Sequence, residues 1–424
     1  MTEVRPVLAF LSWGDRFEDF HDKLGITLDD LRDRLTGTWL FNYVEALQAA
    51  GVAPVLYFVS ARVEDTVRFV HGPTGADVRV LPTPRTHRKL QAARDRFRWP
   101  SAAFASVRSY VATPWRALAE EMRRDGCGAI LCQEYEYPRF DGAVALGRVL
   151  GVPVFATYQG GAGPGSAIER PIRGVAVRRA AGLIAGSRTE LDRVRAAYDV
   201  PDQRLALIPN ALDVRRWVRT DRAAARAELG IADDAQVAVW HGRVEIESKG
   251  LDVLLDAWRV VAGPMPERRL LLIVGTGQDA NAFRRRVATA PAGIRWEDRW
   301  VYEPSEVGRY LSAADVAIRP SRREGFAVSL VEAMACGLPV VATDVSGVPE
   351  AFGEDPVGIV VPTEDPHAIA RAVERLFGDD ALRAELGRRA RERAESEFSL
   401  AAVGARLRRF MDLRGAFAPG ADAG

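Results

Sequence analysis

The sequence predicts an α/β fold of two Rossmann-like domains whose parallel sheets face one another across a cleft. The chain has 424 residues, too many for one ordinary core, and this length suits two domains of about 200 residues each. Short apolar runs rich in β-branched residues alternate with helical stretches, which is typical of parallel sheets covered on both faces. This alternation occurs twice along the chain, once for each expected domain.

Each half of the chain has its own series of expected strands. In the first half these are residues 6–11, 55–60, 78–81, 129–133, 153–158, 183–185 and 205–209. In the second half they are residues 237–240, 270–274, 315–319, 339–342 and 358–361. Between the two series, in IPNALDVRRWVR, a strand ends at a Pro-Asn turn, and we place the domain boundary at Asp213.

The predicted domains are therefore residues 1–213, expected to bind an acceptor, and residues 214–395, expected to bind a donor. Residues 396–424 are predicted to form a C-terminal helix that packs back on the first domain, followed by a disordered tail. Two long excursions interrupt the first half, at residues 14–36 and 84–113, and such segments are usually functional or mobile. The second contains many arginines with Phe97, Trp99 and Phe104 among them. It is either a solvated helix face or a contact surface for an anionic or lipid-linked acceptor.

Composition narrows the class of partner and the compartment. With 58 basic and 57 acidic residues the formal charge is only +1, which gives no reason to expect nucleic acid as a partner. Cys127, Cys132 and Cys336 lack metal-ligand spacing and lie in or beside apolar runs, as buried thiols do in a reducing compartment. We recognise no signal peptide and no membrane span. We expect a bacterial, cytoplasmic protein, with contact between residues 84–113 and the inner face of the membrane as an open alternative.

The segment VAVWHGRVEIESKG is the first candidate for chemistry. A strand ends at His241, Gly242 lets the backbone turn, and Arg243 and Lys249 follow before the next helix. Loops at the carboxyl ends of strands bind ligands in open α/β sheets. A guanidinium and an ammonium at that place can hold a diphosphate, although a solvated charged turn is the alternative.

The segment PSRREGFAVSLVEAMACGLPVVAT carries two carboxylates, Glu324 and Glu332, on either side of a helix start. Glu324 could accept hydrogen bonds from sugar hydroxyls, and Glu332 could bind a ribose diol as acidic residues do in dinucleotide sites. The backbone N–H groups of Gly325, Phe326 and Ala327 would point at an anion lying between them. The alternative is that both carboxylates merely cap the helix.

Together, HGRVEIESKG and EGFAVSLVEAMACGLPVVAT resemble the signature pair of the family-4 glycosyltransferases, retaining enzymes of the GT-B fold that need no metal ion. The resemblance covers essentially the whole second half and includes the E-x7-E spacing of Glu324 and Glu332. It implies that Arg243 and Lys249 hold the diphosphate of a nucleotide-sugar donor, that Glu324 contacts the sugar ring, and that Glu332 contacts the ribose. Arg243, Lys249 and Glu324 are then the catalytic candidates.

The same resemblance implies further donor-binding positions. Gly275, which ends LLLIVG, resembles a glycine turn beneath the nucleotide. Trp300, Val301 and Tyr302 lie where backbone groups of the family read the base, and Trp300 stands where the family often has glycine. Gly37 resembles the glycine at the start of the family's first helix, where the backbone approaches the diphosphate, although a long insertion precedes it.

Acceptor-side candidates come from the first half. FATYQGGAGPG resembles a segment in which many family members have Thr-x-His-Gly, and here Gln159, followed by Gly160, replaces the histidine. Glutamine can hydrogen-bond a hydroxyl or a phosphate but cannot take up a proton. Gln159 is therefore a positioning residue or part of a structural loop. LCQEYEYPRFDG places Glu134, Glu136 and Arg139 at a strand end, where they either bind the acceptor or form an ordinary charged loop.

The remaining histidines, His21, His71, His87 and His367, share no spacing typical of a metal site or a catalytic triad, and we expect them at the surface.

The function predicted from these observations is retaining transfer of a hexose-type sugar from a nucleotide-diphosphate sugar to an acceptor hydroxyl. UDP-sugar is the first choice, with GDP and ADP behind it, and no metal or other cofactor is expected. The acceptor would be a small molecule, a saccharide or a lipid-linked group. Two alternatives stay open. One is a nucleotide-sugar epimerase or hydrolase of the same fold. The other is a catalytically silent nucleotide-sugar-binding partner, a possibility raised by Gln159 in place of the histidine. A nicotinamide dehydrogenase is disfavoured because no G-x-G-x-x-G follows the first strand.

Overall fold

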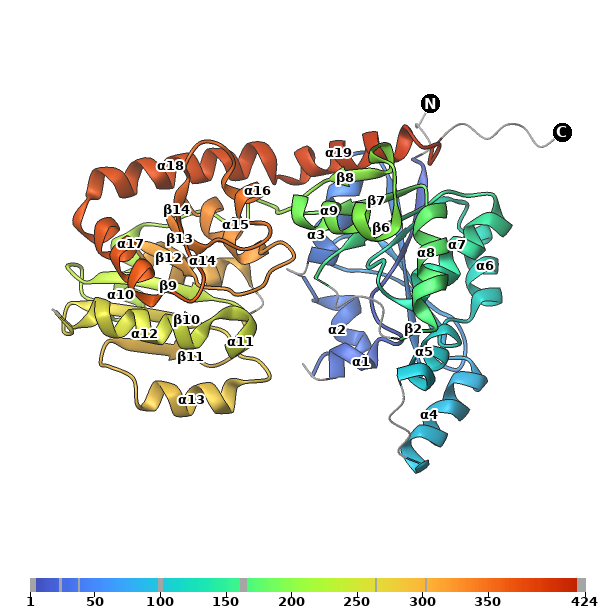
Figure 1. Cartoon of the computed structure of the whole chain (residues 1–424), viewed down its shortest axis with the longest axis horizontal. Helices are drawn as coiled ribbons and strands as arrows, with labels where there is room; N and C mark the ends of the chain where they lie inside the picture. The colour runs from blue at the N-terminus through green and yellow to red at the C-terminus, as the bar shows by residue number, and fades with distance from the viewer. Residues whose placement is uncertain are drawn as a thin grey trace. The chain divides into compact units, whose positions relative to one another are not determined.

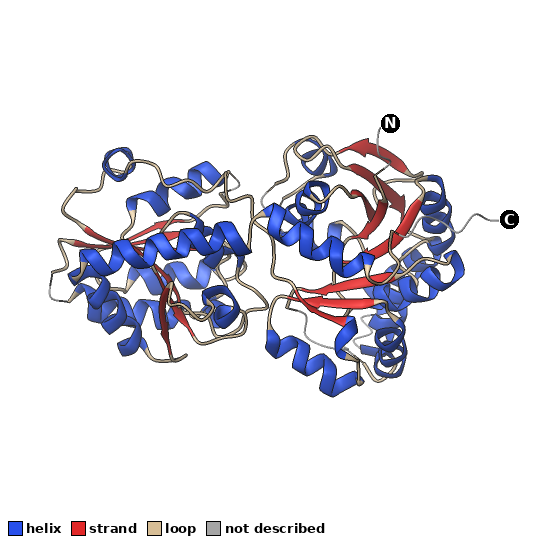
Figure 2. Ribbon diagram, turned by 90° about the horizontal axis from the view of Figure 1, so that it is seen from above, coloured by secondary structure: helices blue, strands red, loops and turns tan. Residues whose placement is uncertain are grey.

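The computed structural model describes residues 5–22, 25–36, 39–97, 102–160, 166–263, 265–301 and 303–417. The chain divides into two compact units, the first made of Met1–Ile208 with Val403–Gly424 and the second of Pro209–Ala402. Each unit is a twisted sheet with helices packed against it (Figures 1 and 2). The predicted fold class of two parallel-sheet α/β domains is confirmed.

The sheet of unit 1 has the strand order β3-β4-β2-β1-β5-β6-β7-β8. The strands are β1 (Val7–Leu11), β2 (Ala53–Ser60), β3 (Val67–Val70), β4 (Asp77–Pro82), β5 (Cys127–Cys132), β6 (Val154–Tyr158), β7 (Gly182–Ala185) and β8 (Leu205–Leu207). All neighbouring strands are parallel except β3, which pairs antiparallel with β4 at the edge. The sequence did not predict β3, because its side chains are mostly exposed and form no apolar run.

The helices of unit 1 up to Tyr198 fill the connections between these strands. They are α1 (Glu18–His21), α2 (Leu28–Asp33), α3 (Trp39–Ala49), α4 (Arg85–Phe97), α5 (Ala102–Tyr110), α6 (Trp115–Arg124), α7 (Pro138–Leu150), α8 (Glu169–Arg179) and α9 (Arg188–Tyr198). The two excursions are helical, since α1 and α2 lie in the first and α4 and α5 in the second. Trp99 lies outside the described residues, as does the side chain of Phe97.

The sheet of unit 2 is entirely parallel, with the order β11-β10-β9-β12-β13-β14. Its strands are β9 (Gln236–His241), β10 (Arg269–Val274), β11 (Ile294–Glu297), β12 (Val316–Arg319), β13 (Val340–Thr343) and β14 (Gly358–Val361). This is the doubly wound order, in which the direction of winding reverses between the first and fourth strands of the series, here β9 and β12. The edge strand β11, only partly buried, was also not predicted.

Both faces of the unit 2 sheet are covered, which explains why its strands read as continuous apolar runs. Along β9, Val237 and Val239 pack into one core cluster while Ala238 and Trp240 pack into another. The covering helices are α10 (Arg222–Glu228), α11 (Ile246–Lys249), α12 (Leu251–Ala262), α13 (Ala280–Ala288), α14 (Pro304–Ala313), α15 (Val328–Ala335), α16 (Val348–Phe352), α17 (Pro366–Gly378) and α18 (Asp380–Glu397).

The chain passes from unit 1 to unit 2 after Ile208, earlier than the predicted boundary at Asp213. Leu212 already belongs to unit 2, because it is buried in that core and its N–H donates to the carbonyl of Phe398 at 2.7 Å. The last helix, α19 (Leu400–Asp412), joins unit 1 from Val403 onward, rather than from residue 396. There Arg408 donates to the carbonyl of Ala50 at 2.6 Å, and the ring of Phe410 contacts that of Phe155.

Two of the histidines expected at the surface are buried, so that expectation was wrong for them. The ring of His71 stacks on Phe41, and its nitrogens contact the Thr74 hydroxyl and the Leu35 carbonyl. His87 is fully buried as well, with its Nε2 3.3 Å from Arg108. Burial lowers the pKa of both imidazoles, so they are held as neutral polar groups.

The three cysteines are free thiols, of which Cys132 and Cys336 are buried. Burial raises the pKa of each of these two thiols to about 12, so neither forms a reactive thiolate at neutral pH. In the part of the chain that the structure describes, no helix is both long enough and apolar enough to span a bilayer.

Candidate functional site

The candidate site lies at the carboxyl edge of the unit 2 sheet, where the strand order reverses. Strands β9 and β12 pair side by side there, and they end at His241 and Arg319. Ligands of open α/β sheets bind in the crevice that forms outside the strand ends at this point. The loops that leave these two strands, together with the helices that follow them, carry most of the residues predicted to bind the donor.

Two glycines pack the loops after β9 and β10 backbone against backbone. Gly242 and Gly275 have φ of 148° and 133°, a region that other residues rarely adopt. A Cβ atom on Gly275 would lie 2.0 Å from the carbonyl oxygen of Gly242. The indole of Trp296 on β11 donates to the carbonyl of Gly275 at 2.8 Å and fixes the turn. Only glycine fits at position 275, as a close turn at a binding edge requires.

The structure brings Lys249 and Glu324 into direct contact. The Lys249 ammonium donates to both carboxylate oxygens of Glu324, at 2.8 and 2.9 Å. The hydroxyl of Ser321 donates to the same carboxylate at 2.8 Å. Gly250 makes the approach of the two loops possible, because a Cβ atom there would lie 1.9 Å from the carbonyl oxygen of Pro320. The structure therefore brings together Lys249 and Glu324, which two separate motifs predict to bind the diphosphate and the sugar.

Arg243 lies in the loop between β9 and α11, the short helix that ends at Lys249, and its side chain is exposed. Its Nε is 2.7 Å from a carboxylate oxygen of Glu245. The loop is anchored by Val244, which is buried and donates its N–H to the carbonyl of Thr276 at 3.0 Å. The guanidinium thus stands on a fixed backbone and can reach an anion in solvent.

Glu332 contacts His241, which in turn contacts Arg319, and the sequence singled out neither of these two residues as functional. One of its oxygens is 2.8 Å from Nε2 of His241, and Nδ1 of that ring is 2.5 Å from the guanidinium of Arg319. In the sequence His241 marks only the end of a strand, and nothing there assigns a role to Arg319. The available signal was a histidine and an arginine that end two otherwise apolar strands, VAVWH and VAIR.

Burial lowers the pKa of both His241 and Arg319. Burial, followed by the nearby Arg319 charge, lowers the pKa of His241 to about 4. Burial also lowers the pKa of Arg319 to about 10, against the opposite influence of the Glu332 and Glu324 carboxylates. Because both carboxylates act on the same guanidinium, the Lys249–Glu324 pair and the His241–Glu332 pair belong to one electrostatic cluster.

The start of α15 separates these two pairs along the chain. Phe326 is buried and its ring contacts that of Phe398, so its side chain serves the core. Ala327 precedes the first helical residue, and no side chain caps the helix there. The backbone N–H groups around Gly325 and Ala327 are the ones that an anion could meet.

The donor-side predictions that remain are Trp300, Val301, Tyr302 and Gly37. Val301 packs against the unit 2 core, and Trp300 is half-buried just after β11. Tyr302 and Gly37 lie outside the described residues.

In unit 1 the corresponding reversal of strand order lies between β1 and β5. Glu134 follows β5 and Gln159 follows its neighbour β6, so the pairing of these two strands places the residues side by side. One carboxyl oxygen of Glu134 accepts the N–H of Gln159 at 2.9 Å, and the other accepts the N–H of Glu136 at 3.4 Å. The Glu134 side chain is buried, which raises its pKa to about 8. Gly160 follows with a φ of 106°, which turns the chain away from β6. A protonatable carboxyl group and the predicted positioning residue thus lie together.

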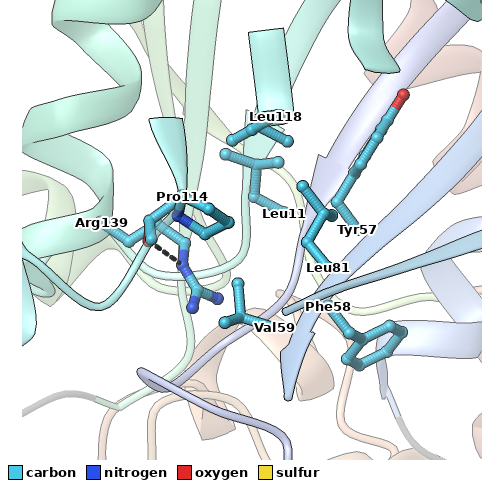
Figure 3. Close-up of a pocket in the computed structure, with 9 residues that line it drawn as sticks. Leu11, Tyr57, Phe58, Val59, Leu81, Pro114, Leu118 and Arg139 are labelled. Carbon is cyan, nitrogen blue, oxygen red and sulfur yellow. Dashed lines mark hydrogen bonds between the residues drawn. The ribbon is translucent and has the colours of Figure 1, made fainter. Parts of the chain in front are cut away.

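Glu136 and Arg139 are engaged with other parts of unit 1. Glu136 pairs with Arg193. The guanidinium of Arg139 donates to the carbonyls of Ser12 and Asp15, each at 2.6 Å. It also donates to the Thr113 hydroxyl, beside a small apolar pocket (Figure 3). Arg139 therefore fixes the loop after β1.

Two family models match this chain. "Glycosyltransferase Family 4" matches residues 37–216, and "Glycosyl transferases group 1" matches residues 221–393. Among curated proteins, the D-inositol 3-phosphate glycosyltransferase of Saccharomonospora viridis is 34% identical over 221 residues, covering 50% of this chain and 51% of that protein. The protein of the same name from Jonesia denitrificans is 30% identical over 230 residues, covering 52% and 54%. The chain spans about half the length of these curated relatives.

Solved structures share the fold over nearly the whole chain. Sucrose-phosphate synthase from Thermosynechococcus elongatus has a TM-score of 0.69 at 21% identity, covering 96% of this chain and 99% of that one. Anabaena HepE in complex with UDP has a TM-score of 0.70 at 15% identity, with the same coverage. These likenesses show the GT-B fold. With the two family models matching most of its length, the chain belongs to the family-4 glycosyltransferases.

Proposed function

We propose that this protein transfers a hexose-type sugar from a nucleotide-diphosphate sugar to an acceptor hydroxyl, with UDP-sugar as the first choice of donor. The observation that carries this proposal is the cluster at the reversal point of the unit 2 sheet. Lys249 contacts Glu324 there, and His241 contacts Glu332. Membership of family 4 and the likeness of fold to a protein solved with UDP support the same reading.

The departing diphosphate would be stabilised by positive charge from the protein. Lys249 supplies a point charge from the end of α11, and Arg243 supplies a planar fork from a fixed loop. Donors preorganised toward developing charge are usually the largest single contribution to catalysis. We therefore propose that transfer needs no metal ion, since these groups can neutralise the leaving group themselves.

We propose front-face transfer with retention of the anomeric configuration, in which the leaving phosphate helps to deprotonate the acceptor hydroxyl. In a two-carboxylate glycosidase, one carboxylic acid protonates the leaving group and the other attacks or activates water. A nucleoside diphosphate neutralised by Lys249 and Arg243 is already a good leaving group and needs no such acid. Glu324 is then available to accept hydrogen bonds from the sugar hydroxyls.

For the acceptor, we propose the carboxyl edge of the unit 1 sheet around Glu134, Gln159 and Gly160. The buried Glu134 carboxyl group holds the backbone of Gln159, and this fixes where the amide side chain begins. Arg139 would act indirectly, by holding the loop after β1. The curated relatives are named for an inositol phosphate acceptor, which makes small hydroxylated acceptors the first to try.

The test has a binding part and a turnover part. Calorimetric titration with UDP, GDP and ADP and their glucose conjugates identifies the donor, and NMR of the product reports the anomeric configuration. An inverted linkage would refute retention. Donor consumption without any acceptor would favour an epimerase or hydrolase, and donor binding without turnover across a broad acceptor panel would favour a silent partner.

A further inference from the structure

Arg319 occupies an unusual place for a charged side chain. It ends strand β12 inside unit 2, and only 4% of its surface is exposed. Its guanidinium donates to the carbonyls of Ile318 and Ser329, at 2.9 and 3.0 Å. Its Nε is buried and has no hydrogen-bond partner among the described residues.

Several other buried arginines are neutralised by direct contact with a carboxylate, although Arg139 is held by carbonyl and hydroxyl groups. Arg173 pairs with Asp141 at 2.6 Å, and Arg226 pairs with Asp315 at 3.0 Å. Arg319 has no such ion pair within the described ranges. Burying a cation without an adjacent anion costs several kcal/mol, roughly, before any compensation. An apolar side chain at the end of VAIR would serve stability better, so the arginine calls for a functional explanation.

His241 connects the Arg319 guanidinium to the Glu332 carboxylate. Nη2 of Arg319 is 2.5 Å from Nδ1 of His241, and Nε2 of His241 is 2.8 Å from a carboxylate oxygen of Glu332. A guanidinium has only donors, so Nδ1 must accept. The single hydrogen of the neutral imidazole then lies on Nε2 and is donated to Glu332. Because burial and the Arg319 charge lower the pKa of His241 to about 4, the ring is neutral at physiological pH.

We infer that Arg319 and His241 are positioning residues that hold the Glu332 carboxylate in one orientation for the ribose of a nucleotide. This inference rests on the proposed donor site. The hydrogen bonds that run from Arg319 through His241 to Glu332 form a relay. This relay engages one oxygen of Glu332, and the other oxygen makes no hydrogen bond to the described residues. A carboxylate fixed through one oxygen presents the other in a defined direction, as recognition of a ribose hydroxyl requires. The relay runs across the two strand ends that flank the reversal point.

The first experiment tests the relay without any nucleotide. The chain has 5 histidines, so ¹⁵N labelling of histidine with assignment by a His241→Gln variant resolves the ring. We expect His241 as the Nε2–H tautomer, unprotonated from neutral pH down to about pH 5. An Nδ1–H tautomer, or titration near the ordinary histidine pKa, would overturn the relay.

The second experiment asks whether the relay serves the ribose. Affinities for UDP, GDP and ADP and for their 2′,3′-dideoxy analogues are compared by calorimetry, using the nucleotide that the wild type binds most tightly. In the wild type the hydroxyls should strengthen binding about tenfold or more, as expected for a hydrogen bond to a charged group. His241→Leu and Glu332→Gln should each abolish most of this preference, and the double variant should lose little more. His241→Gln, which keeps a donor and an acceptor, should retain part of it.

His71→Leu is the matched control, because it removes another buried, hydrogen-bonded histidine from unit 1. It should change thermal stability but leave the preference for the ribose hydroxyls intact. If His241→Leu weakens nucleotide and dideoxy analogue by the same factor, the role of the relay is only structural and the inference fails. If the wild type binds no nucleotide at all, both the proposed function and the role of the relay in ribose binding fail. The tautomer measurement still decides whether the relay exists.

Discussion

The ammonium of Lys249 lies between both carboxylate oxygens of Glu324, at 2.8 and 2.9 Å, and joins the loop after β9 to the loop after β12. A diphosphate that binds Lys249 must share this ammonium with Glu324. The contact therefore couples the two loops and places the sugar-binding candidate within reach of the phosphate-binding candidate. Charge-assisted contacts of this kind are about twice as strong as neutral ones.

Replacement of Lys249 by methionine should weaken donor binding without unfolding the protein. The expected loss is about 1.5 to 3 kcal/mol of binding free energy, the usual range for a hydrogen bond to a charged group. Calorimetric titration with the best nucleotide sugar measures it. Lys89→Met is the control, because Lys89 is one of the few other lysines and is exposed on α4. Equal affinities of Lys249→Met and wild type would remove Lys249 from the site.

Replacement of Gly275 by alanine should destabilise unit 2 by about 2 kcal/mol or more, because the substitution adds both backbone strain and a clash. The residue has a φ of 133°, and the new Cβ would lie 2.0 Å from the carbonyl oxygen of Gly242. Thermal unfolding followed by circular dichroism reports the change. Gly378→Ala, at the end of α17 with no atom within 4 Å of its added Cβ, should be nearly neutral. A Gly275→Ala protein as stable as Gly378→Ala would show that the turn relaxes freely.

The sequence predicts strands best where both faces of the sheet are buried. The runs at 237–240 and 270–274 are strands because nearly every side chain in them is covered. Strands β3 and β11 escaped prediction because they lie at sheet edges, carry Arg68 and Arg295, and leave much of their surface to solvent. The edge strands β8 and β14 are predicted because each is an apolar run, LAL and GIVV. The charged residues within β3 and β11 interrupt that run, so a linear pattern does not show these two strands.

The candidate site also has a part that the sequence predicts and a part that it does not. Lys249 and Glu324 follow from the two sequence motifs, because each lies in the segment that follows a predicted strand. The contact between Arg319 and His241 does not follow from the sequence. Arginine side chains are mostly exposed, so a sequence alone gives no reason to expect a buried one. Only the pairing of β9 with β12 shows that these two strand ends meet.

Glu134 should make the stability of unit 1 depend on pH in a defined direction. Burial raises its pKa from 4.5 to about 8 in the folded protein, so between these values the folded state binds more protons than the unfolded state. Its contribution to stability is therefore fully present below about pH 4.5 and is lost as the pH rises through about 8. The difference in unfolding free energy between wild type and Glu134→Gln should fall from about pH 5 to about pH 9. Chemical denaturation at a series of pH values measures this difference, and a constant difference would contradict the raised pKa.

Gln159 should affect the acceptor and not the donor, because it lies in unit 1 while the donor candidates Lys249, Glu324 and Glu332 lie in unit 2. Gln159→Ala should lower kcat/KM for the acceptor about tenfold, the cost of one lost hydrogen bond near a charged group. Its affinity for the nucleotide should be unchanged. Gln48→Ala serves as the control, since it removes a unit 1 amide that donates to the carbonyl of Thr74, on a different loop.

Gln159→His then tests whether this position takes part in proton transfer. Glutamine has no titrating group, so the pH dependence of kcat/KM in the wild type should show no limb from this side chain. The histidine variant introduces a group that titrates near pH 6.5, roughly, when its pKa is unperturbed. If Gln159 only positions the acceptor, the variant gains a limb at that pH and remains active above it, where the imidazole is neutral and can still donate and accept. If the variant is inactive at every pH, the amide has a geometric role that imidazole cannot fill. A profile identical to that of the wild type would place residue 159 outside the acceptor site.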